Sequence, residues 1–308
     1  MRSPTQVVLS RAEVAAMVVD GLGAVDVVDA VELSGGTFAA VWRVSLADGR
    51  DVVVKVGPPP GTRLLRYERG LIPAEAEYFR LVGERVPGVP VPSVLAASDG
   101  WIITTLLPGR PLTGGDARRA RTELGAAIAA VHGISGPYFG YSGDRPSGAD
   151  WPTAFGAIVA ALRADAAEWN VPLPPLDGVL ERHRGVLAAV TRPALLHFDL
   201  WDGNVLVSPA GGLAGLVDGE RYLYGDPLLD LVSPALFRRI EDEPDHPFLR
   251  GYRPGPFDAA ARTRLSLYRL HLYVLMITEG PSRGIARHDG RHDRLTDLLT
   301  AELALLTA

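Results

Sequence analysis

The chain has 308 residues, enough for two lobes that each bury a hydrophobic core. Its hydrophobic content of 47% and charged content of 22% are ordinary for a globular protein and exclude a mainly disordered chain. The formal net charge of −5 and the lack of a Lys- or Arg-rich block give no electrostatic reason to expect a nucleic acid partner.

The sequence contains no Cys, which excludes disulfides and thiolate zinc sites and fits a reducing compartment. Residues 1–10 lack the basic and then apolar pattern of a secretory signal. The most apolar late stretch, residues 265–278, is interrupted by Arg269 and His271 and is too short to cross a bilayer. We therefore expect a soluble, cytoplasmic protein without a membrane partner, and its oligomeric state stays open.

Short β-branched runs separated by turns dominate the first third of the chain. Strands are expected over residues 27–33, 39–46, 51–56, 94–97 and 101–106. Asp48-Gly49 is typical of a hairpin turn between the second and third strands. Pro73 is typical of a helix start, and this helix continues to Val82. These elements predict a five-stranded antiparallel sheet with one helix inserted after the third strand.

Beyond residue 108 the spacing of apolar residues becomes helical. Helices are expected over residues 117–132, 153–169, 176–190, 258–277 and 293–306. A Gly/Pro/Tyr-rich segment, residues 135–152, and an acidic, Pro-rich segment, residues 241–256, are expected to form loops. The sequence therefore predicts an α+β chain of two lobes, residues 1–107 with the sheet and residues 108–308 with most of the helices.

The segment HFDLWDGN, residues 197–204, carries the most specific chemical signal. Asp199 is followed by Asn204, and Asp218 ends a later apolar run. In a phosphoryl-transfer site with this layout, the first Asp orients the acceptor hydroxyl while the Asn and the second Asp hold Mg²⁺ on the nucleotide phosphates. The loop taken alone also fits a structural interpretation, in which Asp and Asn only form a turn. Asp218 after the apolar run favours the chemical interpretation.

Two further segments could bind a nucleotide. Gly35, Gly36 and Thr37 lie between two expected strands, so their backbone amides could close over a polyphosphate, or they could form a plain hairpin turn. No Gly-Lys-Ser/Thr follows, which excludes a Walker A loop. Where the chain leaves the first lobe, we expect the Thr105 carbonyl and the Leu107 amide to face an adenine edge. An ordinary linker fits this segment equally well.

Lys55 stands in the apolar third strand, where a Lys can reach the α- and β-phosphates if a carboxylate on the inserted helix holds it. We expect Glu75 to be this partner, with Glu77 as the alternative. Their side chains point in different directions on a helix, so only one of them can face the site. The alternative for Lys55 itself is a solvated position on an edge strand.

Buried polar residues should support the loop around Asp199. His197 is expected to be a hydrogen-bonding support, because the seven His residues show no zinc-type pairing. Asp230 is expected to hydrogen-bond this loop from below. Asp226 has the features of a turn or cap residue before a helix.

Together these residues resemble the aminoglycoside phosphotransferase family, within the choline-kinase-like and protein-kinase-like fold. The resemblance covers about residues 33–231 and rests on the Gly35-Gly36 loop, Lys55, the Glu75 helix, Val89-Pro90-Val91-Pro92, Leu107-Pro108-Gly109, the 197–204 segment, Asp218, Gly225-Asp226-Pro227 and Asp230. It implies a bilobal fold, ATP or GTP with Mg²⁺ as cofactors, Asp199 as the catalytic base, and Asn204 and Asp218 as metal ligands.

Two positions depart from this family. Phe198 stands where its members commonly have the Gly of His-Gly-Asp, and Gly219 stands where they often carry an aromatic or other bulky residue. Neither change removes a reacting group, so the resemblance still implies an active enzyme. Glu220 adds a carboxylate that could lie near the metal or bind an acceptor amine or hydroxyl.

The acceptor is expected between the loop at Asp199 and the C-terminal helices. The candidate lining residues are Trp151, Asp165, Glu168, Glu241 and Asp242. An acidic lining would suit a cationic antibiotic, although charge runs usually face solvent. We therefore expect a small-molecule kinase for an aminoglycoside-like or other hydroxylated antibiotic, with a role in antibiotic resistance. The alternative is a metabolite kinase for a sugar, fructosamine or amino alcohol.

Two other classes of function remain as alternatives. A non-catalytic nucleotide-binding protein on the same fold would bind nucleotide without turnover, but all the reacting side chains are present. A metal-dependent phosphoesterase would use the same carboxylates without ATP and would leave Lys55 unexplained.

Overall fold

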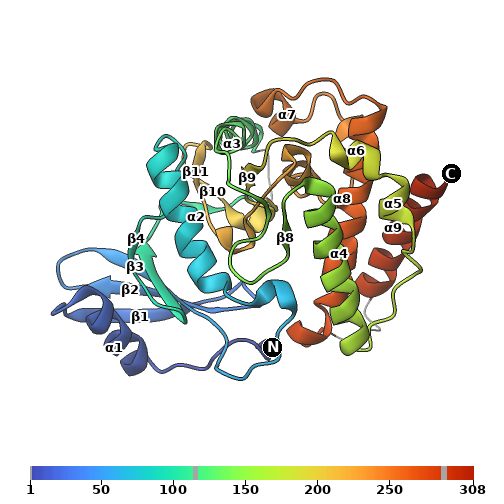
Figure 1. Cartoon of the computed structure of the whole chain (residues 1–308). Helices are drawn as coiled ribbons and strands as arrows, with labels where there is room; N and C mark the ends of the chain where they lie inside the picture. The colour runs from blue at the N-terminus through green and yellow to red at the C-terminus, as the bar shows by residue number, and fades with distance from the viewer. Residues whose placement is uncertain (1, 114–116, 286–289) are drawn as a thin grey trace.

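The computed structural model describes residues 2–113, 117–285 and 290–308 (Figure 1). The first lobe contains one antiparallel sheet in the order β1-β2-β3-β5-β4. Its strands are β1 (Val27–Leu33), β2 (Ala40–Leu46), β3 (Asp51–Val56), β4 (Val94–Ala97) and β5 (Trp101–Thr105). The expected five-stranded sheet is therefore confirmed, with strand ends within a residue of those expected. The helix after the third strand, α2 (Leu71–Arg85), begins before Pro73 and ends after Val82.

The two faces of this sheet are covered by different helices. Neighbouring residues of a strand point to opposite faces, and Ile102 joins the core beside α2 while Ile103 joins a separate cluster beside α1 (Arg11–Leu22). Helix α1 was not expected from the sequence. Its start carries a capping box, in which the Ser10 side chain accepts from the Glu13 amide and the Glu13 carboxylate accepts from the Ser10 amide.

The second lobe is mostly helical, as expected. Its α-helices are α3 (Arg118–Val131), α4 (Trp151–Glu168), α5 (Val179–Arg182), α6 (Arg184–Ala188), α7 (Pro247–Tyr252), α8 (Ala259–Thr278) and α9 (Gly290–Thr307). Helix α8 is buried along most of its length and packs against α4 and α9. In Figure 1, α4, α8 and α9 lie together on the side away from the sheet.

Two small antiparallel sheets carry the loops of interest. One has the order β11-β10-β6 and the other β8-β7-β12-β9. Their strands are β6 (Arg110–Pro111), β7 (Phe139–Gly140), β8 (Ser147–Gly148), β9 (Ala194–Leu196), β10 (Val205–Val207), β11 (Leu213–Leu216) and β12 (Leu223–Gly225). The 197–204 segment joins β9 to β10, and Asp218 follows β11. The short 3-10 helices nearest to them are η1 (Arg66–Glu68), η2 (Asp202–Asn204), η3 (Gly219–Arg221), η4 (Pro227–Val232), η5 (Ile240–Asp242) and η6 (Pro281–Arg283).

Three expectations for the second lobe were wrong in detail. The single helix expected over 176–190 is two short helices, because Gly178 is left-handed and His183 leaves the helical conformation between them. The expected loop 241–256 contains α7, which begins at Pro247 and is capped by the His246 side chain. The expected loop 135–152 contains β7 and β8.

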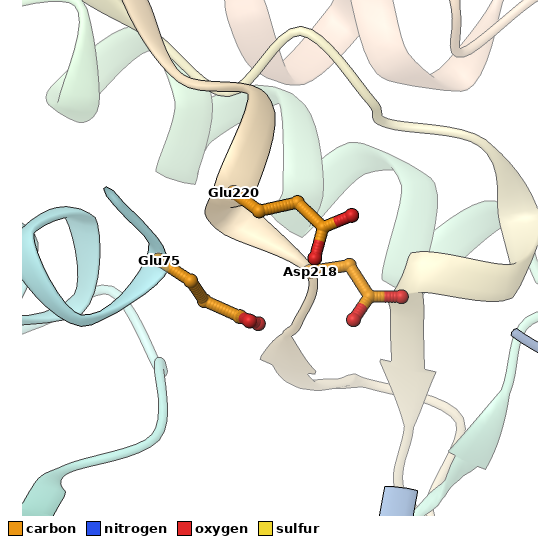
Figure 2. Close-up of side chains that lie close together, drawn as sticks. All are labelled: Glu75, Asp218 and Glu220. Atoms are coloured by element: carbon orange, nitrogen blue, oxygen red, sulfur yellow. The ribbon is translucent and has the colours of Figure 1, made fainter. Parts of the chain in front are cut away.

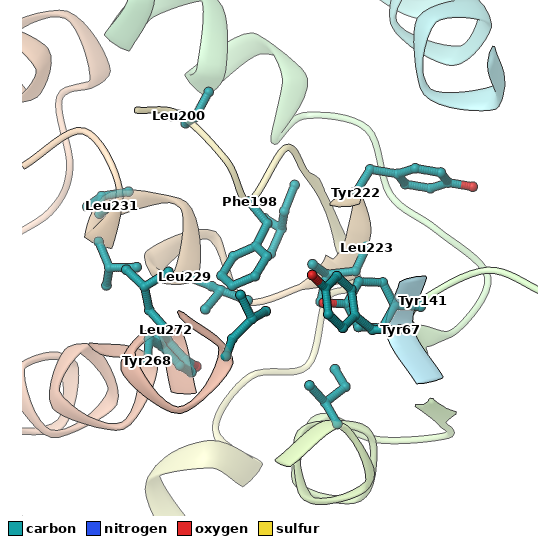
Figure 3. Close-up of a cluster of buried hydrophobic side chains, with 14 of the residues drawn as sticks. Tyr67, Tyr141, Phe198, Leu200, Tyr222, Leu223, Leu229, Leu231, Tyr268 and Leu272 are labelled. Carbon is teal, nitrogen blue, oxygen red and sulfur yellow. The ribbon is translucent and has the colours of Figure 1, made fainter. Parts of the chain in front are cut away.

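A large hydrophobic cluster lies under the 197–204 segment. Phe198, Leu200 and Tyr222 belong to it, together with residues of α8 such as Tyr268 and Leu272 (Figure 3). The rigidity of this packed core limits how far the segment above it can move. Among the residues that the structure describes, no helix combines the length and the hydropathy that a bilayer crossing requires.

A glycine contact between α3 and α7 gives a test of the packing. A Cβ on Gly251 would lie 1.8 Å from the Thr122 carbonyl oxygen, and neither backbone can give way cheaply. We expect Gly251→Ala to lower the free energy of unfolding by about 3 kcal/mol, measured by chemical denaturation. The control is Gly156→Ala in α4, where a Cβ meets no atom within 4 Å. That change should raise stability by about 0.5–1 kcal/mol. Equal effects of the two variants would contradict the packing described here.

Candidate functional site

A buried Lys surrounded by three carboxylates forms the centre of the site. Strand β3 directs Lys55 toward α2, where its Nζ lies 2.8 Å from Glu75 Oε2. The same Nζ lies 2.8 Å from Asp218 Oδ1 and 2.5 Å from Glu220 Oε2. Figure 2 shows the three carboxylates converging from α2 and from the segment after β11. The structure thus places Lys55 beside Glu75, and not on a solvated strand edge.

The local backbone structure places each carboxylate beside Lys55. Glu75 lies on the buried face of α2, and Glu220 lies in η3. Asp218 has φ 58°, a left-handed conformation that Asp tolerates better than most residues, and this turns the chain from β11 into η3. Sequence reasoning named Glu220 only as a secondary candidate, yet it makes the shortest of the three contacts with Lys55.

The charges in this cluster do not balance. Burial acts to lower the pKa of Lys55, but the three carboxylates outweigh it and raise that pKa well above the usual value, so the ammonium stays charged. Burial raises the pKa of Glu75 to about 8, although Lys55 opposes this. One ammonium faces three carboxyl groups, of which Glu75 is mostly protonated at neutral pH, and their oxygens lie within 4.8 Å of one another. Such a group of oxygens could hold a divalent cation.

His197 connects the Asp199 loop to the strand that precedes Asp218. Its Nδ1 accepts a hydrogen bond from the Asp199 amide at 3.2 Å, so the ring proton must be on Nε2, which donates to the Val217 carbonyl at 3.1 Å. Burial lowers the pKa of His197, which favours this neutral form. The imidazole therefore fixes the relative positions of Asp199 and Asp218.

Asp230 holds the same loop from beneath. Its fully buried carboxylate accepts from the backbone amides of His197 at 2.9 Å and Phe198 at 2.6 Å. It also contacts His132 Nε2 at 2.9 Å. These bonds hold Phe198 at φ 64°, a left-handed conformation that is costly for a bulky residue.

The Phe198 ring also has a defined place in the core. It stacks on the His271 ring, with the centroids 5.0 Å apart, and is almost completely buried. This packing and the two hydrogen bonds from the His197 and Phe198 amides to Asp230 offset the backbone strain at Phe198. The backbone beside Asp199 is therefore left-handed without a glycine.

Asn204 lies on the other side of the Asp199 backbone. Its Nδ2 donates to the Asp199 carbonyl at 2.9 Å, and its own backbone carbonyl accepts from the Val217 amide at 3.1 Å. With the nitrogen engaged, the side-chain oxygen is the atom of Asn204 suited to a metal. Asn204 and His197 thus both join the Asp199 loop to Val217.

Arg221 is a residue of the site that sequence reasoning missed. Its Nε lies 3.7 Å from Asp199 Oδ2, and its Nη2 lies 2.7 Å from Glu279 Oε1. Burial raises the pKa of Asp199 to about 6, and Arg221 opposes this rise. No spacing in the sequence indicated Arg221, because its contacts with Asp199 and Glu279 exist only in the folded chain.

The glycine loop is tied to the N-terminal segment. The Gln6 side-chain amide donates to the Gly36 carbonyl at 3.0 Å, and the Thr5 hydroxyl donates to the Thr37 carbonyl at 3.0 Å. Gly35 has φ 130°, where glycine is favoured. Sequence reasoning named the loop but neither residue that anchors it.

Thr105 and Leu107, the residues expected at an adenine edge, lie at and just after the end of β5. Thr105 ends β5 opposite Val52, and the amide of Leu106 donates to the Asp51 carbonyl at 3.4 Å. The Leu107 side chain lies over Gly215, where a Cβ would be 2.3 Å from Leu107 Cδ1.

Two candidates for an acceptor site are engaged in the core. Trp151 is completely buried, and its indole N–H donates to the Tyr268 hydroxyl at 2.8 Å. Glu241 is buried in an ion pair of 2.7 Å with Arg269. These contacts give both residues structural roles, which corrects the expectation that they line the acceptor site.

The other three candidates are paired with Arg residues. Asp242 is exposed and pairs with Arg262 at 2.7 Å. Asp165, which is buried, and Glu168, which is exposed, both contact Arg66. Asp165 borders a narrow space that is also lined by Tyr67, Tyr141 and His271. Of the five candidates, Asp165 alone lines this space.

The buried carboxylate of Asp230 gives a second test. We expect Asp230→Ala to lower the free energy of unfolding by about 3 kcal/mol or more, because two buried amides and His132 lose their acceptor. Chemical denaturation measures this effect. The control is Asp245→Ala, which removes an exposed partner of Arg250 and should change stability by less than about 0.5 kcal/mol. A similar small effect of Asp230→Ala would show that the loop does not depend on this carboxylate.

Comparison with known proteins relates this geometry to a family. Residues 29–268 match the phosphotransferase enzyme family, APH. YniA from Escherichia coli K12, named a probable ketoamine kinase, is 31% identical over 260 residues, which cover 78% of this chain and 83% of YniA.

Solved structures share the same fold. A crystal structure from Thermobifida fusca, whose name is putative fructosamine-3-kinase, has a TM-score of 0.71 at 25% identity and covers 96% of this chain and 100% of its own. The streptomycin-ATP-APH(2'')-IIa ternary complex has a TM-score of 0.59 at 17% identity and covers 98% and 97% of the two chains, which shows a similar fold. The chain therefore belongs to the APH phosphotransferase enzyme family: it is a phosphotransferase with a protein-kinase-like fold.

Proposed function

We propose that this phosphotransferase is a ketoamine kinase, which transfers the γ-phosphoryl group of ATP to a hydroxyl of a sugar-derived ketoamine. The observation that carries the reaction is the joint placement of Lys55, Asp218 and Asp199, connected through His197. The name of YniA, at 31% identity over most of both chains, supports the acceptor class. ATP as donor is supported by the ATP complex of a protein with the same fold.

Residues of both lobes would bind the nucleotide. Lys55, held by Glu75, meets the α- and β-phosphates, and the backbone amides of the 35–37 loop close over them. Thr105 and Leu107 present backbone groups to the adenine. The excess of carboxylate oxygens around Lys55 fits a hard cation such as Mg²⁺.

Asn204 and Asp218 would hold this Mg²⁺, with Glu220 near enough to contribute. When bound, the ion supplies positive charge that neutralises the phosphate oxygens. Asn204 is prepared for this role because its amide nitrogen is committed to the Asp199 carbonyl. Burial acts to raise the pKa of Asp218, but Lys55 outweighs it and lowers that pKa, so this ligand stays ionised.

Asp199 orients the acceptor hydroxyl and receives its proton. A pKa of about 6 leaves its carboxylate mostly ionised at neutral pH and still basic enough to accept a proton. The backbone around it is fixed by His197, Asp230 and Asn204, so the carboxylate is held in place before the acceptor arrives.

The proposed ketoamine acceptor replaces the antibiotic acceptor that the sequence led us to expect. An aminoglycoside-like acceptor was favoured by an acidic lining, but Trp151 and Glu241 are engaged in the core. The APH(2'')-IIa structure with streptomycin is 17% identical to this chain, whereas YniA is 31% identical. A ketoamine carries hydroxyls together with an amine, and it corresponds to the metabolite alternative of the sequence analysis.

An acceptor panel tests this proposal directly. The purified protein, with ATP and Mg²⁺, is given a fructose–amine adduct, an aminoglycoside and choline, and phosphorylated products are measured by mass spectrometry. We expect kcat/KM for the ketoamine to exceed the others by at least about tenfold, since discrimination of this size needs little more than 1.4 kcal/mol. Preference for the aminoglycoside would overturn the ketoamine assignment.

The control for the panel is Asp199→Asn, which keeps the shape of the side chain but removes its basicity. Turnover should fall by about 10²–10⁴-fold, while the affinity for ATP, measured by calorimetry, changes little. Full turnover by this variant would show that Asp199 is not the base. Release of phosphate from esters without ATP would instead favour a phosphoesterase.

Arg221 should set the pH range of activity. Protonated Asp199 cannot accept a proton, so kcat/KM should fall below about pH 6. Arg221 lowers the pKa of Asp199, and Arg221→Gln should therefore raise that pKa and move the acidic limb of the profile to higher pH. Arg250→Gln removes an equal charge at an exposed position and should leave the limb unchanged. An unshifted limb in Arg221→Gln would contradict the electrostatic role of Arg221.

A further inference from the structure

Gly219 occupies a place where no side chain fits. A Cβ at this position would lie 2.1 Å from Cδ1 of Tyr78 and 2.8 Å from Cγ and Cε1 of the same ring. Its φ is not in the left-handed region, so the backbone itself would accept another residue. The Tyr78 ring, and not local backbone geometry, therefore demands glycine between Asp218 and Glu220.

Tyr78 reaches this point from α2. It follows Glu75 by three residues, which places the two side chains on the same face of the helix. Glu75 contacts Lys55, while the completely buried Tyr78 ring lies on the backbone at Gly219. One turn of α2 thus contacts both the strand Lys and the segment that carries Asp218 and Glu220.

The Tyr78 ring also contacts His197, which supports the proposed base Asp199. Its centroid lies 5.2 Å from that of His197, with an interplanar angle of 82°, an edge-to-face contact. His197 in turn accepts the hydrogen bond from the Asp199 amide. Tyr78 is therefore in contact with the nucleotide half and the acceptor half of the site.

We propose that Tyr78 is a positioning residue, whose ring fixes α2 against the Asp218–Glu220 segment and His197 and thereby aligns Lys55 with Asp199. The proposal rests on the roles given to Lys55 and Asp199 in the proposed function. The Tyr78 ring fills from α2 the space that a side chain at position 219 would enter first, because a Cβ there would lie 2.1 Å from Tyr78 Cδ1. The departure at Gly219 and the ring of Tyr78 are two parts of one arrangement.

The ring, and not the hydroxyl, is the part of Tyr78 that matters in this role. The hydroxyl oxygen is buried and has no hydrogen-bond partner among the described residues. A buried hydroxyl in this situation weakens stability. The contacts that position α2 are those of the ring with Gly219, His197 and Tyr222.

A ring-exchange experiment tests the proposal. Tyr78→Ala, Gly219→Phe and the double variant are compared with the wild type by kcat and by KM for ATP. Each single change should lower kcat roughly ten- to hundredfold, since small misplacements of reacting groups have effects of this size. In the double variant, the ring introduced by Gly219→Phe points into the space that Tyr78 vacated, so kcat should recover at least about tenfold over both single variants. Effects that simply multiply would overturn the proposal.

A variant at another buried aromatic residue distinguishes a positioning role of Tyr78 from a purely stabilising one. Trp42 belongs to the hydrophobic cluster beside α1, on the face of the sheet opposite to Lys55. Trp42→Leu and Tyr78→Leu should both lower the melting temperature, but only Tyr78→Leu should lower kcat of the folded protein. Equal kcat values in these two variants would show that Tyr78 has only a structural role. Tyr78→Leu also serves if Tyr78→Ala does not fold.

A second readout keeps this test independent of the acceptor. ATP hydrolysis without acceptor and the rise in melting temperature caused by Mg²⁺-ATP are measured on the wild type, the two single variants and the double variant. If the wild type does not phosphorylate ketoamines, the acceptor proposal fails, while recovery of ATP hydrolysis in the double variant still supports Tyr78. If the double variant recovers neither kcat nor ATP hydrolysis, the role of Tyr78 is overturned, while the acceptor proposal is unaffected.

Discussion

The pairing of one buried ammonium with three carboxylates is the constraint on which this site depends. Lys55 and Glu75 come from the first lobe, and Asp218 and Glu220 come from the second. A buried charge is tolerated only when it is paired, so the two lobes meet at this point for electrostatic reasons. The carboxyl groups outnumber the ammonium at this point, which is consistent with the Mg²⁺ site proposed for the nucleotide.

The carboxylate of Asp199, the proposed base, is positioned by neighbouring residues that would not contact the acceptor. Asp230 holds the backbone before Asp199, Asn204 holds its carbonyl, and His197 ties it to the strand before Asp218. Three separate supports on one short loop permit a strained Phe198 beside Asp199. Strain of this kind persists only where the surroundings leave the backbone no other choice.

The sequence was informative wherever the signal was local. The β-branched runs predicted strands such as Asp51–Val56, and the spacing of Asp199 and Asn204 indicated the 197–204 segment as the candidate catalytic loop. It was uninformative wherever the contact joined distant segments. The pairing of Lys55 with Glu220 spans 165 residues, and nothing in the acidic run at Glu241 showed that its carboxylate would be buried against Arg269. Helix α1 was missed because it buries only Val14 and Val18, which leaves a weak apolar pattern.

The hold of Thr5 and Gln6 on the glycine loop has an evolutionary consequence. The family match begins at residue 29, so Thr5 and Gln6, which anchor the loop, lie before the matched residues. Substitutions at Thr5 or Gln6 can change the position of the 35–37 loop while Lys55, Asp199 and Asp218 stay the same. Two proteins with the same residues at the site can therefore differ in the position of this loop through a segment that lies before the family match.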